Sequence, residues 1–119
     1  MKLTLSGMLL CSMAAGPAFA DCTAKDFSIE GLKVETTQVG RPMVITGHLV
    51  NHCGSAAAAQ IKIEALDSSG NSIQSRMGWP GGTTNLAPGD SASFSMGRMF
   101  RYSSDMASYR AAVVAARVW

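Results

Sequence analysis

Apolar and polar residues alternate in short runs along this chain, and turn-forming residues separate one run from the next. In residues 58–66, Ile61 and Ile63 alternate with Lys62 and Glu64. A period of two places successive side chains on opposite faces of a β-strand, so this run predicts a strand with one buried face. The same period predicts further strands at residues 27–35, 43–50, 72–77, 91–99 and 109–118.

Residues with special backbone preferences interrupt and connect these strands. In residues 27–35 the apolar parity switches at Gly31, which predicts a β-bulge or a bend there. Residues 67–71 (DSSGN) and 86–90 (LAPGD) predict turns. Residues 103–105 predict one turn of helix before the last strand, because Ser and Asp cap helices. The alanine-rich residues 111–116 favour a longer helix as the alternative, whereas Val113, Val114 and Val118 favour the strand.

Six or seven short strands with alternating faces predict an all-β fold, an immunoglobulin-like β-sandwich. Its expected core is formed by the apolar residues on the inward faces of the strands. These residues are Phe27, Ile29, Leu32, Val34, Ile45, Leu49, Ile61, Ile63, Ile73, Leu86, Phe94, Met96, Val114 and Val118.

Residues 1–20 have the three parts of a secretory signal peptide. Lys2 supplies the positive charge, an apolar run follows it, and Ala18 and Ala20 supply the small residues before the cleavage point. Cleavage there leaves residues 21–119 as a single β-sandwich domain, in the periplasm or outside the cell. The apolar run is shorter than the ~20 residues of a membrane-spanning helix, so we expect no transmembrane segment after signal removal.

Signal removal leaves two cysteines, Cys22 and Cys53. An even number of cysteines in an exported chain predicts a disulfide. This bridge closes a loop of about thirty residues and stabilises the fold by roughly 3–4 kcal/mol in the chain-entropy model. Metal and redox motifs usually hold their cysteines close together in the sequence, and these two are far apart.

The nearly neutral charge of the mature chain argues against nucleic acid as a partner. Without Lys2, nine Lys and Arg residues balance eight Asp and Glu residues. Because nucleic-acid-binding domains are usually strongly basic, we expect no nucleic-acid partner.

Three segments together resemble the FxLYD-type domains of bacterial exported proteins. They are residues 44–51 (VITGHLVN), residues 61–70 (IKIEALDSSG) and residues 86–94 (LAPGDSASF). The resemblance extends over residues 27–118 and implies an immunoglobulin-like sandwich with a non-enzymatic role. Two features depart from that pattern: Ala65 and Leu66 stand where an aromatic residue is typical, and the loop at residues 78–82 is longer.

We expect no catalytic residues, because a Gly-x-Ser-x-Gly element is absent and the mature chain has only two histidines. We also expect no cofactor and no metal. The alternative is a Cu(I) site with imidazole and thioether ligands, for which the candidates are His48, His52, Met96 and Met99.

Trp79 and Pro80 lie in a glycine-rich loop and are the candidate partner-binding residues. A tryptophan in such a loop either anchors a partner or folds back over one end of the core. We therefore expect an exported, non-enzymatic binding or accessory domain of the bacterial cell envelope. It would engage a protein partner through loops near Trp79 and a sheet edge. The alternatives are periplasmic copper or metal handling and inhibition of an envelope hydrolase.

Overall fold

The computed structural model describes residues 22–119, so the signal peptide expected at residues 1–20 lies outside the described part. Within residues 22–119, no helix is long and apolar enough to cross a membrane. The regular elements are six strands and two short 3₁₀ helices. In chain order they are η2 (Ala24–Asp26), β1 (Phe27–Glu35), β2 (Val44–Asn51), β3 (Ala58–Leu66), β4 (Ser72–Gly78), β5 (Ser91–Ser95), η3 (Gly97–Met99) and β6 (Ser108–Arg117).

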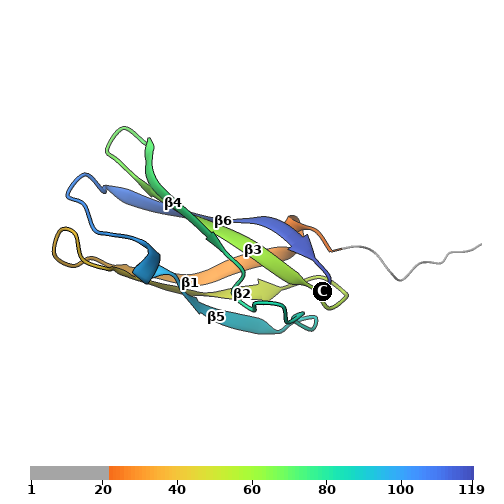
Figure 1. The fold of residues 1–119 in the computed structure, drawn as a ribbon. Helices are drawn as coiled ribbons and strands as arrows, with labels where there is room; N and C mark the ends of the chain where they lie inside the picture. Colours follow the sequence, from red (N-terminus) through yellow and green to blue (C-terminus); the bar gives the residue numbers. More distant parts are fainter. Residues whose placement is uncertain (1–21) are drawn as a thin grey trace, which may run out of the picture.

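The strands form two antiparallel three-stranded sheets (Figure 1). Sheet 1 has the order β1-β2-β5, and sheet 2 has the order β4-β3-β6. The two central strands, β2 and β3, bury alternate side chains between the two layers. The central strand β3 does so most fully, since Ile61, Ile63 and Ala65 are each 0 % exposed. The prediction of an all-β sandwich is confirmed.

The bulge expected in β1 is present at Gly31. The pairing of β1 with β2 shifts between Glu30 and Lys33, and Gly31 has a φ of 64°. Glycine adopts this left-handed conformation without the steric cost that a side chain adds. Because the bulge moves Leu32 out of the inward row, Leu32 is 37 % exposed and its assignment to the core is wrong.

A second bulge explains the wrong core assignments in β6. Gln60 pairs with Ala115 and Ile61 pairs with Val113, so Val114 is left between them without a partner on β3. Val113 therefore packs against the core, whereas Val114 is 41 % exposed. Val118 lies beyond the end of the strand and is 63 % exposed, so it is not a core residue either.

The inward side of β4 carries polar residues, so the assignment of Ile73 to the core is wrong. Ile73 is 39 % exposed, because its neighbours Gln74 and Arg76 take the inward positions. Gln74 bonds both backbone groups of Arg101: its Oε1 accepts from the amide at 3.2 Å and its Nε2 donates to the carbonyl at 2.7 Å. The Arg76 Nε donates to the Met99 carbonyl at 3.0 Å.

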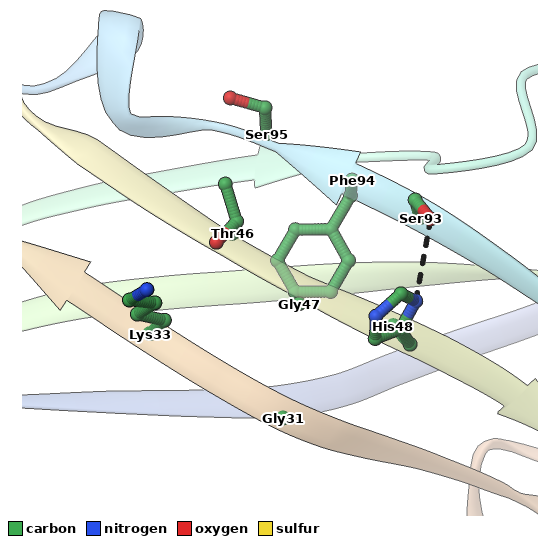
Figure 2. Close-up of a pocket in the computed structure, with 8 residues that line it drawn as sticks. All are labelled: Gly31, Lys33, Thr46, Gly47, His48, Ser93, Phe94 and Ser95. Carbon is green, nitrogen blue, oxygen red and sulfur yellow. Dashed lines mark hydrogen bonds between the residues drawn. The ribbon is translucent and has the colours of Figure 1, made fainter.

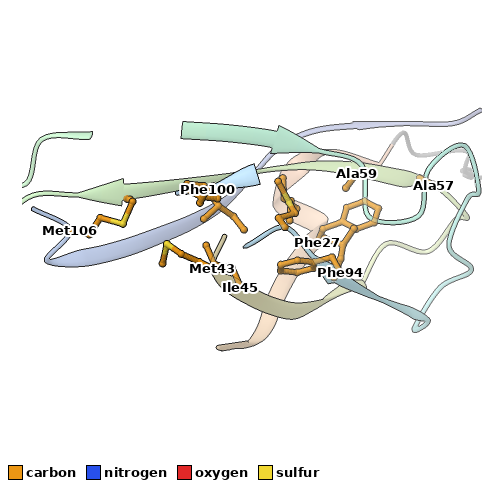
Figure 3. Packing of buried hydrophobic residues seen from close by; sticks show 13 residues of the cluster. Phe27, Met43, Ile45, Ala57, Ala59, Phe94, Phe100 and Met106 are labelled. Carbon is orange, nitrogen blue, oxygen red and sulfur yellow. The ribbon is translucent and has the colours of Figure 1, made fainter. Parts of the chain in front are cut away.

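The hydrophobic core between the sheets also includes residues from the connections (Figure 3). Met43, Phe100 and Met106 are buried although none of them lies in a strand. Phe100 follows η3, which approaches the backbone of Met43 so closely that a Cβ on Gly97 would clash with it. The core therefore extends under the segment that connects β5 to β6.

Two local predictions around that segment are wrong. The strand expected at residues 91–99 ends at Ser95, because η3 follows. The helical turn expected at residues 103–105 is a β-turn, in which the Met106 amide donates to the Ser103 carbonyl at 3.0 Å.

The predicted disulfide is present. Cys22 and Cys53 are bonded, with a Cα–Cα distance of 5.8 Å, and they join the segment before η2 to the connection after β2. Asn51, which is 0 % exposed, lies beside this bridge. Its Oδ1 accepts from the Cys53 amide at 2.7 Å, and its Nδ2 donates to the carbonyls of Ser55 at 3.0 Å and Leu86 at 2.8 Å. Since each bond satisfies a group that burial would otherwise leave unpaired, the amide holds the β2–β3 and β4–β5 connections together with three hydrogen bonds.

Candidate functional site

Two tryptophans meet at the end of the sandwich that carries the disulfide. Trp79 follows β4 and Trp119 follows β6, and their rings pack edge to face with centroids 5.5 Å apart. The guanidinium carbon of Arg117 lies 4.0 Å from the Trp119 ring centroid, which is a cation–π distance. Trp119 is 45 % exposed, and Trp79 and Pro80 are half-buried. We call Trp79, Pro80, Arg117 and Trp119 the aromatic end.

Hydrogen bonds from a neighbouring connection position the aromatic end. The Asn85 Oδ1 accepts from the Trp119 amide at 3.0 Å. The next residue, Leu86, exchanges two backbone hydrogen bonds with Ala57, of 2.8 and 3.0 Å. On the other side, the Gly82 amide donates to the Trp79 carbonyl at 2.8 Å and closes the loop. Both indoles are therefore carried on backbone that is tied to the sandwich.

Trp79 and Pro80 also line a hollow of about 240 Å³ against strand β5. The other lining residues are Gly78 and residues 93–96. Trp79 contacts Trp119 and is not a member of the core cluster. The structure thus places the two sequence-predicted residues beside β5, which within residues 22–119 is an edge strand of sheet 1.

A second hollow, of about 520 Å³, lies on the outer face of sheet 1 (Figure 2). Its polar lining includes Lys33, Thr46, His48 and Ser93, and the His48 Nδ1 is 3.2 Å from the Ser93 Oγ. The floor is Gly47, where the Phe94 ring lies so close that a side chain would not fit. The hollow is wide and shallow, so it offers a polar surface rather than an enclosed chamber.

One serine, histidine and carboxylate lie together beside the disulfide. The Ser28 Oγ donates to Glu30 Oε2 at 3.0 Å and is 2.8 Å from His52 Nε2. In a nucleophilic triad, the serine and the carboxylate bond opposite nitrogens of the imidazole ring. Glu30 instead approaches the same Nε2, at 3.7 Å, so the cluster forms an exposed polar contact.

The candidate copper ligands lie in different environments. His48 is exposed on the outer face of sheet 1, and His52 contacts Ser28. Met96 is buried in the core, and Met99 in η3 is 45 % exposed. His48 and Met96 therefore lie on opposite faces of one sheet. Among residues 22–119, no group of three or more His, Cys, Asp and Glu side chains is arranged to hold a metal ion.

The outer face of sheet 2 contains an ion pair between its central strand and β6. The Glu64 Oε1 accepts from Arg110 at 2.9 and 3.1 Å, and these hydrogen bonds hold the pKa of the Glu64 carboxyl below its ordinary value of 4.5. A hydrogen bond with Ser72 lowers this pKa further. On the inner side of β6, burial raises the pKa of the Tyr109 hydroxyl.

Sequence analysis missed Arg117 and Asn85 and assigned no site role to Trp119. The signal available in the sequence was that each tryptophan lies just beyond a predicted strand, Trp79 after residues 72–77 and Trp119 after residues 109–118. No protein-family model, curated protein or solved structure matches the chain. The resemblance to FxLYD-type domains therefore stays a prediction.

Proposed function

We propose that this chain is an exported, non-enzymatic binding domain that engages a protein partner in the bacterial cell envelope. The observation that carries the proposal is the aromatic end. Tryptophan and arginine side chains are the residues that most often dominate the binding energy of protein interfaces. Here two indoles and a guanidinium are half-exposed, in mutual contact and supported by the backbone.

Two further observations support the proposal. The Cys22–Cys53 bridge is typical of proteins that fold in an oxidising compartment such as the periplasm. The hollow between the Trp79 loop and β5 lies next to the aromatic end, so a partner side chain that enters it would also contact an indole. Ordering costs are small at such a site, because the loop is already closed by the Gly82–Trp79 hydrogen bond.

The test is chemical cross-linking of the exported protein in intact cells, with Trp79→Ala as the variant. We expect this variant to lose the cross-linked species while its melting temperature stays close to that of the wild type, since Trp79 lies outside the core. Val39→Ala is the matched control. Val39 is 68 % exposed and lies in the β1–β2 connection at the opposite end of the sandwich (Figure 1).

Two results would contradict the proposal. Equal cross-linking by Trp79→Ala and the wild type would show that the aromatic end does not contact the partner. A large fall in the melting temperature of Trp79→Ala would assign that indole to the fold rather than to a partner.

A further inference from the structure

Strand β6 is the longest edge strand of the molecule. It lies at the end of sheet 2 and pairs with β3 on one side, and within residues 22–119 no strand is hydrogen-bonded to its other side, although β1 and η2 pack against part of it. Its ten residues contain no proline and no acidic residue. The bulge at Val114 divides it, so the stretch before the bulge, residues 108–113, is regular in register. A long regular edge of this kind is a template for pairing with another chain.

The other three edge strands carry features that discourage pairing. Strand β5 has only five residues. Strand β1 contains the Gly31 bulge, and the charged residues Glu30 and Lys33 flank it. Strand β4 directs the charged side chain of Arg76 inward. Short length, bulges and inward charges are the usual means by which proteins protect edges, so β6 is the least protected of the four.

The inward row of β6 is incompletely covered. Tyr109, Ala111 and Val113 pack against the core but are only half-buried, whereas the β3 residues paired with them are fully buried. On the facing sheet, Ile29 and Val34 of the edge strand β1 are half-buried in the same way. A strand added beside β6 would direct every second side chain toward these residues. Apolar residues at those positions would be removed from water.

The outer face near this stretch is basic. Lys62 pairs in register with Ala112, and Arg110 lies two residues before Ala112 on β6. These two cations share one carboxylate, that of Glu64, at 3.9 Å from Lys62 and 2.9 Å from Arg110, so this stretch has one net positive charge. A second copy of the chain, paired antiparallel through its own residues 108–113, would bring a second set of Lys62, Arg110 and Glu64 to the shared face and so place net positive charge beside net positive charge. An added strand with acidic outward residues would instead find complementary charge.

We propose that residues 108–113 of β6 bind an extended segment of another polypeptide by strand addition. The segment would alternate apolar side chains, directed toward Tyr109, Ala111 and Val113, with acidic side chains, directed toward the basic outer face. Backbone hydrogen bonds would supply affinity and the alternating side chains specificity. This inference rests on the proposed function and names the sheet edge and the chemistry of the partner.

The probe is a synthetic ten-residue peptide that alternates valine with glutamate, mixed with the exported, disulfide-bonded protein. Amide hydrogen exchange followed by NMR locates its binding. We expect exchange to slow in residues 108–113 and to stay unchanged in β1, β4 and β5. A peptide that alternates valine with lysine should bind more weakly. The glutamate peptide with alternate amides N-methylated should not bind, because it has lost the donors that pair with the edge.

Ala112 provides a matched pair of protein variants, because it is exposed on the outer face. Ala112→Lys should strengthen and Ala112→Asp should weaken binding of the glutamate peptide, each by about 1.5- to 5-fold, as cross-strand charge pairs do. Unchanged circular dichroism would show that both variants fold.

Three outcomes would overturn the inference: no binding of the glutamate peptide, protection at β5 instead of β6, or equal affinity for the two Ala112 variants. The proposed function fails separately. If Trp79→Ala abolishes cross-linking in cells while both Ala112 variants cross-link like the wild type, the proposed function is supported and the proposed binding to the β6 edge is contradicted. If neither position affects cross-linking, both proposals fail.

Discussion

The two edge strands of sheet 2, β4 and β6, pair with the same central strand but are covered differently. Beneath β4, the inward side chains Gln74 and Arg76 bond the backbone of the β5–β6 connection, and Phe100 lies fully buried under them. The Arg76 guanidinium carbon is 5.8 Å from the Phe100 ring centroid. Beneath β6, the inward side chains are apolar and half-buried.

The two edge strands of sheet 2 thus differ in whether another part of the chain covers their inward side chains. At β4, the chain supplies its own cover, and polar inward residues are tolerated because each finds a backbone partner. At β6, the inward row lacks such a cover and stays partly exposed. The first arrangement contributes to folding, whereas the second leaves apolar area and backbone groups available to another molecule.

The largest expected effect comes from removing the cover of β4. Phe100→Ala should lower the free energy of unfolding by about 3–5 kcal/mol, because it empties a fully buried ring site. Val113→Ala under β6 should cost only about 1 kcal/mol, because it removes two methyl groups from a half-buried position. Urea denaturation of both variants measures the difference. Equal losses would mean that the two edges are equally well covered.

A smaller effect should follow from the Gln74 amide. Gln74→Ala removes both hydrogen bonds to Arg101 and should destabilise the fold by about 1–2 kcal/mol. Its neighbour Ser75 points to the outer face and is exposed, so Ser75→Ala should change stability by less than about 0.5 kcal/mol. Thermal unfolding compares the two, and an unstable Ser75 variant would contradict this account of β4.

The smallest effect concerns the ion pair on the outer face. In Arg110→Ala the pKa of Glu64 should rise toward its ordinary value of 4.5, which an NMR titration of the carboxyl measures. Folding lowers the pKa of the Glu64 carboxyl, so the ionised carboxylate stabilises the native state at pH values above the pKa of the unfolded chain. This stabilisation is lost as the pH falls through the pKa of the folded protein. The wild-type melting temperature should therefore fall more steeply on acidification than that of Arg110→Ala. Parallel curves would show that the pair contributes nothing.

Strands whose neighbours lie on both sides were the easiest to predict. The bounds expected for β3, residues 58–66, agree with the structure, because full burial of one face makes the period of two unbroken. The prediction of strand ends failed where tertiary contacts determine the conformation of the backbone. The alternation of residues 91–99 continues beyond Ser95, yet Gly97 allows η3 to approach Met43 and ends the strand there.

The candidate site was predictable in part for a similar reason. Trp79 and Pro80 are conspicuous in a glycine-rich loop, and the structure places them beside a strand with an open edge. The contact of Trp79 with Trp119 depends on the register of two strands against β3, which no local pattern reveals. The inward direction of Gln74 was equally hidden, because its partner is a backbone distant in sequence.

The buried amide of Asn51 has a consequence for the distant indoles. Asn51 donates to the Leu86 carbonyl, Leu86 follows Asn85, and the Asn85 side chain accepts from the Trp119 amide. A carboxylate of the same shape at position 51 would have no proton for Leu86. The position of the exposed Trp119 is thus linked, through Asn85 and Leu86, to one hydrogen of a fully buried side chain.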